Sequence, residues 1–176
     1  MELKESKTYR NLKAAFAGES EARNKYTYYA SKAKKEGYNQ IGTVFMESAE
    51  NEKEHAKIWF KLLNSGIAST KENLKDSIAS ESYENTVMYK QFAREAKEEG
   101  FDEISLLFER VGEIEKTHEE RYKKLLENLE CGTVFLKPKE EMWICSNCGY
   151  SILAKQAPET CPVCSHPQGY FVLGEI

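Results

Sequence analysis

The two stretches that decide the fold are Glu52-Lys53-Glu54-His55 and Glu115-Lys116-Thr117-His118. Each places a glutamate and a histidine three positions apart, so both side chains project from one face of a helix. Apolar residues recur every three to four positions on either side of both stretches, and the Glu-x-x-His pairs fall in the apolar phase. Ionised carboxylates buried between helices are costly unless cations neutralise them. The two stretches therefore predict a helical bundle that holds two metal ions in its interior.

The second stretch repeats the first at an offset of 63 residues, and the repeat extends over the flanking helices. The matched pairs are Tyr26/Tyr89, Ile41/Ile104, Phe45/Phe108, Glu52/Glu115 and His55/His118. An isolated Glu-x-x-His motif is most often part of a solvated helix surface, but its recurrence at equivalent apolar-phase positions favours a metal site. Glycines at 37, 66 and 100 follow runs of helix formers and are typical helix stops. We expect a duplicated helical hairpin, with helices at about 4–36, 39–64, 70–99 and 102–130, forming a pseudo-two-fold four-helix bundle.

Composition divides the chain of 176 residues near residue 131. Residues 1–130 contain neither proline nor cysteine, whereas all four prolines and all five cysteines follow. This predicts a mainly α protein with a helical domain at 1–133, a linker at 134–138 and a small β-rich domain at 139–176. A net charge of −4 with mixed signs disfavours nucleic acid as a partner. Because the sequence shows neither a long apolar segment nor an apolar leader, we expect a cytoplasmic protein without a membrane partner.

Further carboxylates lie on the first and third predicted helices. Glu19 falls in the apolar stripe of the first helix, and Glu81 and Glu84 fall between apolar residues of the third. With the two Glu-x-x-His pairs they make a mixed oxygen and nitrogen ligand set that suits iron or manganese. Tyr26 and Tyr89 fall near the inward faces. They are either ordinary core aromatics or donors of hydrogen bonds to metal-bound carboxylates.

The C-terminal segment carries two Cys-x-x-Cys knuckles separated by twelve residues. Their sulfurs make a tetrahedral thiolate site, for which the residues alone leave zinc and a single iron open. Gly149 permits a tight turn that aims backbone N–H groups at sulfur, and Ser165 can occupy the equivalent place in the second knuckle. We expect Cys131 to be an incidental free thiol and His166 to be a surface residue. The four predicted ligands are Cys145, Cys148, Cys161 and Cys164.

Taken together, these motifs resemble the rubrerythrin family. The resemblance rests on AFAGESEARNKYTYYA at residues 15–30, the two Glu-x-x-His helices, the Glu81/Glu84 pair and the terminal CxxCGY and CPVC motifs. It implies a ferritin-like four-helix bundle followed by a rubredoxin-like domain, with two iron ions in a carboxylate-bridged site and one iron in the four-cysteine site. It also implies a cytoplasmic peroxidase that reduces hydrogen peroxide to water in oxidative-stress defence. The electrons would come from NAD(P)H-dependent reductases or a rubredoxin, through the rubredoxin-like iron.

The resemblance also implies a role for each bundle ligand. Glu52 and Glu115 would bridge the two irons. One iron would also bind Glu81 and His118, and the other would bind Glu19.

By the resemblance, Glu84 is the sixth carboxylate that rubrerythrins have and that most relatives of the family lack. The resemblance implies that Glu84 and His55 exchange as ligands when the iron changes oxidation state, because ferric iron favours an anionic ligand. The predicted catalytic residues are Glu84, His55, Tyr26 and Tyr89. Two rival functions are ferritin-like iron storage and simple electron transfer. Mineralisation needs neither Glu84 nor a fused cysteine domain, and an electron carrier does not need buried carboxylates, so both rivals are disfavoured.

Only about five residues, 65–69, connect the second and third predicted helices, where many rubrerythrins have a long segment. In the ferritin arrangement these two helices run parallel, so the chain must return along the bundle over a distance on the order of 35 Å. Six extended steps reach only about 20 Å. We therefore expect a helix-swapped homodimer, in which helices one and two of one chain pack on helices three and four of its partner.

Overall fold

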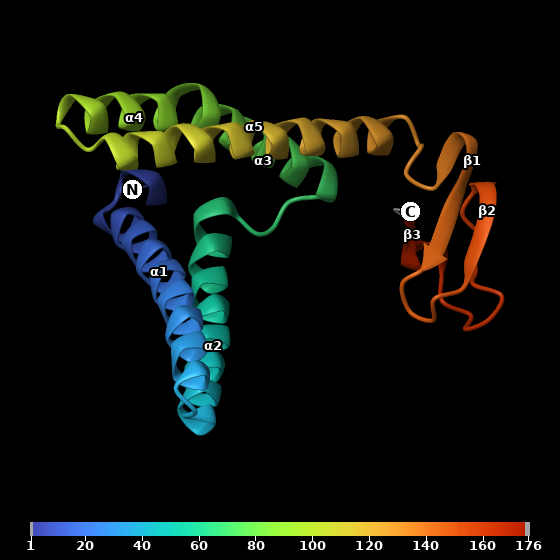
Figure 1. Ribbon diagram of the computed structural model, residues 1–176, viewed down its shortest axis with the longest axis horizontal. Helices are drawn as coiled ribbons and strands as arrows, with labels where there is room; N and C mark the ends of the chain where they lie inside the picture. Colours follow the sequence, from blue (N-terminus) through green and yellow to red (C-terminus); the bar gives the residue numbers. More distant parts are fainter. Residues whose placement is uncertain (1, 175–176) are drawn as a thin grey trace. The chain divides into compact units, whose positions relative to one another are not determined.

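The computed structural model describes residues 2–174, which form a series of helices followed by a small antiparallel sheet (Figure 1). The chain divides between Ala68 and Ser69 into two compact units. The expected class, mainly α with a small C-terminal β-rich part, is confirmed. Over residues 2–174, no helix combines the length and apolar character that crossing a bilayer requires.

The first unit is an antiparallel hairpin of α1 (Lys7–Lys35) and α2 (Asn39–Asn64), preceded by a 3-10 turn, η1 (Leu3–Glu5). The helix α1 begins three residues after the expected start near residue 4, because the Ser6 side chain caps α1 by accepting the Tyr9 N–H. Gly37 ends the helix with a φ of 88°, which a residue with a Cβ rarely adopts. Small residues pack the two helices together, namely Ala30, Ala33, Gly42, Ala49 and Ala56.

The helices of the second unit form another hairpin. One arm consists of α3 (Thr70–Tyr83), the π-turn η2 (Glu84–Met88) and α4 (Tyr89–Glu98), and it packs along α5 (Asp102–Glu130). A capping box starts α3, since Ser69 and Glu72 satisfy each other's backbone N–H groups. The expectation of one regular helix at 70–99 is wrong, because the hydrogen bonds change register at the π-turn, where the Tyr89 N–H donates to the Glu84 carbonyl.

The C-terminal part is a three-stranded antiparallel sheet in the order β2-β1-β3. Its strands are β1 (Leu136–Cys145), β2 (Ser151–Gln156) and β3 (Phe171–Leu173), and a 3-10 turn, η3 (Gln168–Tyr170), leads into β3. The strand β1 begins inside the stretch predicted as a linker, while the domain boundaries themselves stay a prediction. The core of this part contains Cys145 and Cys161 of the predicted thiolate site, packed with Trp143, Ala157 and Phe171.

Candidate metal centres

The first hairpin brings together Glu19 from α1 with Glu52 and His55 from α2, as the sequence predicts. One ligand atom of each lies within 4.8 Å of the others. His55 Nδ1 is 2.8 Å from Glu52 Oε2 and 4.0 Å from Glu19 Oε1. This group of three is called half-site 1. It presents two carboxylates and one imidazole, which is a donor set for a divalent or trivalent metal.

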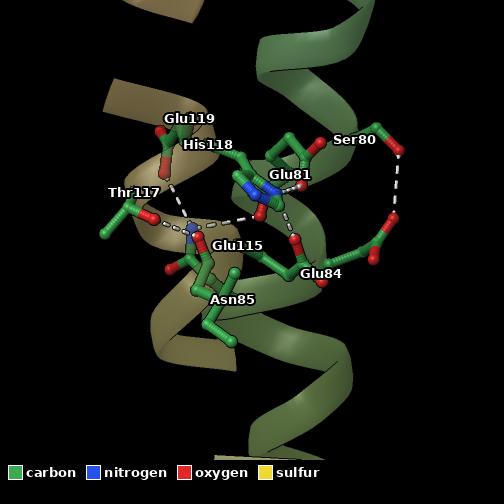
Figure 2. A network of polar contacts seen from close by, with 9 residues as sticks. Ser80, Glu81, Glu84, Asn85, Glu115, Thr117, His118 and Glu119 are labelled. Carbon is green, nitrogen blue, oxygen red and sulfur yellow. Dashed lines mark hydrogen bonds and ion pairs between the residues drawn. The ribbon is translucent and has the colours of Figure 1, made fainter. Parts of the chain in front are cut away.

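The second hairpin builds the same arrangement, called half-site 2, from Glu81 of α3 with Glu115 and His118 of α5 (Figure 2). His118 Nδ1 is 2.7 Å from Glu115 Oε2 and 3.8 Å from Glu81 Oε2. These distances match those of half-site 1 to within about 0.2 Å, which the duplication of the hairpin explains. Each hairpin therefore assembles three ligands by its own packing.

The carboxylates of half-site 2 repel one another. Burial raises the pKa of Glu81, and a hydrogen bond with Glu115 together with the nearby charges of Glu115 and Glu84 raises it further, while His118 opposes the shift. Burial likewise raises the pKa of Tyr89, followed by the charges of the same three glutamates. A pair of carboxylates that resists full ionisation is one that a bound cation stabilises.

Glu84 does not join half-site 2. It is the first residue of the π-turn, and its Oε1 accepts a hydrogen bond of 3.3 Å from the Ser80 hydroxyl, one turn earlier on α3 (Figure 2). Its negative charge nevertheless reaches Glu81 and Tyr89, since it raises the pKa of both. Glu84 thus lies beside the half-site, and its service as a ligand stays a prediction.

The two tyrosines lie half-buried in equivalent aromatic clusters. The ring centroids of Tyr26 and Phe45 are 6.2 Å apart, and those of Tyr89 and Phe108 are 6.1 Å apart. This geometry accounts for both residues as packed aromatics at the hairpin interfaces. Their hydrogen bonds to metal-bound carboxylates stay a prediction.

The four predicted cysteines converge on one point. Their sulfurs lie within 4.8 Å of one another, with Sγ–Sγ distances of 3.7 Å for Cys145/Cys164 and 3.6 Å for Cys148/Cys161. A tetrahedral thiolate site with metal–sulfur bonds of about 2.3 Å has sulfur–sulfur edges of about 3.8 Å. The sulfurs are therefore already spaced for a single tetrahedral metal ion.

The knuckles that hold these sulfurs have the same backbone. The N–H of Gly149 bonds the Cys145 carbonyl at 2.8 Å, and the N–H of Ser165 bonds the Cys161 carbonyl at 2.9 Å. Both turn residues have a positive φ, 77° for Gly149 and 60° for Ser165. The predicted equivalence of Gly149 and Ser165 is confirmed, although serine adopts this conformation at a cost that glycine avoids.

Backbone amides and neighbouring sulfurs set the charge state of the thiols. The N–H of His166 lowers the pKa of Cys164, with bonds from neighbouring thiols and Asn147 in support, to about 6. The Tyr150 amide lowers the pKa of Cys148 in the same way. Burial and the other three sulfurs outweigh this effect and raise the pKa of Cys148 to about 12. One thiolate thus forms readily and discourages the next, so four thiolates together require a cation.

Of the remaining expectations about single residues, one is confirmed and one is wrong. Cys131 is an exposed free cysteine, as expected. His166 is half-buried rather than a plain surface residue, since its Nδ1 lies 3.1 Å from the Cys164 carbonyl oxygen and its ring packs edge-on to Tyr170. Asn85 and the buried Glu119, which no sequence motif singles out, bond each other beside half-site 2.

The donor sets define a class of protein: a di-iron carboxylate protein with an added four-cysteine, rubredoxin-like iron centre. The rubrerythrin family model matches residues 10–126 and 72–143, and the model of the rubrerythrin rubredoxin-like domain matches residues 143–172. The chain belongs to the rubrerythrin family, whose members are oxidoreductases of oxidative-stress defence.

Individual relatives agree over nearly the whole chain. A rubrerythrin from Porphyromonas gingivalis is 50% identical over 96% of this chain and 90% of its own length. A rubrerythrin from Nitratidesulfovibrio vulgaris is 44% identical over 97% of this chain and 96% of its own. Among solved structures, mixed-valence nigerythrin is 30% identical over 96% of this chain and 87% of that chain, with a TM-score of 0.37.

Proposed function

We propose that the protein is a non-haem di-iron peroxidase that reduces hydrogen peroxide to water. The reaction consumes one peroxide, two electrons and two protons, and yields two water molecules. The observation that carries the proposal is the presence, in one chain, of two matching Glu/His half-sites and a preformed four-sulfur site. Two electrons must be available together for the O–O bond to break, whereas a four-thiolate iron passes electrons one at a time.

We assign the ligands according to the half-sites. Glu19, Glu52 and His55 would hold one iron, Glu81, Glu115 and His118 would hold the other, and Glu52 and Glu115 would serve as the bridging carboxylates. When bound, the ferrous pair supplies two electrons and polarises the O–O bond. The negative charges of the half-buried carboxylates favour the higher oxidation state of the metals.

Glu84 and His55 are the ligands that we propose to exchange during the reaction. The Glu84 carboxylate makes one long hydrogen bond to an exposed serine, so little holds it in its present position. An anionic oxygen suits ferric iron, and a neutral imidazole suits ferrous iron. Tyr26 and Tyr89 complete the proposed set by donating hydrogen bonds that orient the carboxylates.

The electron donors we propose are NAD(P)H-dependent reductases, directly or through a rubredoxin, with entry at Cys145, Cys148, Cys161 and Cys164. A cytoplasmic location also stays a prediction. The decisive experiment is to reduce the iron-loaded protein without oxygen and add one equivalent of peroxide while recording the visible spectrum. Reoxidation by peroxide should be much faster than by air. Equal rates with air and peroxide would contradict the peroxidase assignment and favour iron oxidation for storage.

We further propose a helix-swapped homodimer as the active form. In the ferritin arrangement, α2 and α3 are parallel. From Glu52, α2 continues to Asn64, and α3 begins at Thr70, eleven residues before Glu81. At 1.5 Å per residue the return spans about 35 Å, but the five linking residues reach only about 20 Å.

Side-chain exposure supports the same proposal. Large apolar residues that the helical period assigns to a bundle core are about half exposed, including Ile41, Val44 and Leu62 on α2 and Ile104 and Leu107 on α5. A matching hairpin would cover them, and in the dimer that we propose a second copy of the chain supplies it. Each complete site would then take ligands from both chains.

A further inference from the structure

The two half-sites differ by one residue of spacing. Glu19 and Glu81 are equivalent members of their half-sites, and they are 62 residues apart. Tyr26 and Tyr89, which follow them on the same helical arms, are 63 residues apart. One extra residue therefore lies between Glu81 and Tyr89, and the π-turn at Glu84–Met88 occupies this interval.

The π-turn absorbs the extra residue. In a regular α-helix each residue adds about 100° of rotation, so a spacing of eight rather than seven would rotate Tyr89 by about 100° from the position that Tyr26 has relative to Glu19. The wider turn removes this rotation. Tyr89 consequently keeps its place against α5, where a Cβ added to Gly112 would lie 3.1 Å from the Tyr89 Cβ.

A partly buried polar pair fastens the π-turn to α5. The Asn85 amide Nδ2 donates to the Glu81 carbonyl at 3.0 Å and to Glu119 Oε2 at 2.7 Å (Figure 2). Glu119 is 8% exposed, and its other oxygen accepts from Lys123 at 2.6 Å. The first repeat has Ala56 at the position of Glu119, so this pair belongs only to the hairpin with the insertion.

Glu84 has a backbone held in the π-turn and a carboxylate that little holds in place. Its backbone is the start of the π-turn, directly before the anchored Asn85, while its carboxylate bonds only the exposed side of α3 through Ser80. We propose that Asn85 and Glu119 are positioning residues, which hold the inserted π-turn against α5 so that Glu84 can reach the metal site. The inference rests on the proposed role of Glu84 as an exchanging ligand, and it explains why only the second hairpin supplies such a ligand.

The test is a double-mutant cycle read by the midpoint potential of the di-iron site in the iron-loaded protein. Glu84→Gln should weaken the preference for ferric over ferrous iron at least about tenfold, which raises the potential by about 59 mV per electron. Asn85→Ala should shift the same preference in the same direction by about three- to tenfold, and Glu119→Ala, which also loses the bond to Lys123, by at least as much. In the Glu84→Gln background, either change should add nothing.

Two variants serve as controls. Glu119→Gln keeps an acceptor for Asn85 and should leave the hydrogen exchange of the amides at 84–89 native in the metal-free protein. Thr117→Ala changes the residue on the other side of His118 and should retain the native potential. The Thr117 hydroxyl donates to the Ile114 carbonyl of its own helix and takes no part in the Asn85–Glu119 pair. In metal-free protein, hydrogen exchange of the amides at 84–89 should accelerate in Asn85→Ala and not in Thr117→Ala.

The possible outcomes separate the two claims. If Glu84→Gln raises the potential but Asn85→Ala and Glu119→Ala change only thermal stability, the positioning role is wrong and the ligand role of Glu84 stands. Shifts that persist in full in the Glu84→Gln background would also overturn the positioning role, because the pair would then act through another ligand. An unchanged potential in Glu84→Gln would overturn both.

Discussion

Two inactive chains should restore each other's activity if each di-iron site takes ligands from two subunits. Glu52→Ala damages half-site 1 and leaves half-site 2 intact, whereas Glu115→Ala does the reverse. In a swapped heterodimer, one site combines the two damaged halves and the other combines the two intact halves. If each site were instead formed within one chain, every site in the mixture would lack one bridging carboxylate.

The size of the recovery follows from counting. Random pairing of equal amounts of the two chains makes half of the dimers heterodimers, and each heterodimer has one intact site out of two, so about one quarter of the wild-type activity per chain should return. The two homodimers contribute nothing, because each of their sites lacks a bridging ligand. The expected recovery rests on the swap that we propose, in which residues 65–69 need not return along the bundle.

The assay is peroxide consumption after the differently tagged chains are unfolded together, refolded with ferrous iron and purified by both tags. The matched control mixes Glu52→Ala with His55→Ala, since both changes damage half-site 1 and no pairing makes a complete site. Purified heterodimers of the first pair should have about half of the wild-type activity, and those of the control pair should have none. Equal inactivity of both heterodimers would refute the swapped arrangement.

Three further outcomes are expected. Cys148→Ser should abolish the visible absorption of thiolate-bound iron yet leave the di-iron pair measurable by iron analysis, because the two sites share no ligand; loss of all iron would contradict this separation. Glu115→Ala should abolish peroxide turnover and lower bundle iron content, whereas the exposed Glu120→Ala should change neither. In metal-free protein the raised pKa of Glu81 means that the folded chain keeps a proton that the unfolded chain releases, so this group makes the free energy of unfolding fall as pH rises above the usual range of glutamate. Urea unfolding at about pH 5 and about pH 7 should show a smaller fall in Glu81→Gln, and an identical fall would contradict the assignment.

The helices and both ligand sets could be predicted from the sequence because their determinants are local or periodic. Glu52 and His55 lie three positions apart on one helix, and the 63-residue repeat places Glu115 and His118 in the same relation. The cysteine knuckles are similarly local, since each pair is joined by a short turn whose shape depends on Gly149 or Ser165. Patterns of this kind depend on neighbouring residues, so they can be recognised before the tertiary contacts are known.

Other features depended on contacts between distant residues and appeared only in the tertiary structure. The π-turn is one, because the sequence of 84–88 is compatible with a regular helix and only packing against α5 fixes where the extra residue is accommodated. The buried Glu119 is another, because its charge would indicate a surface position until Asn85 and Lys123 are seen to bond it. The sequence by itself thus determined which residues can bind metal, through their spacing along the chain. The tertiary structure decided which of these residues meet, because burial and hydrogen bonding between helices fix which helix faces pack together.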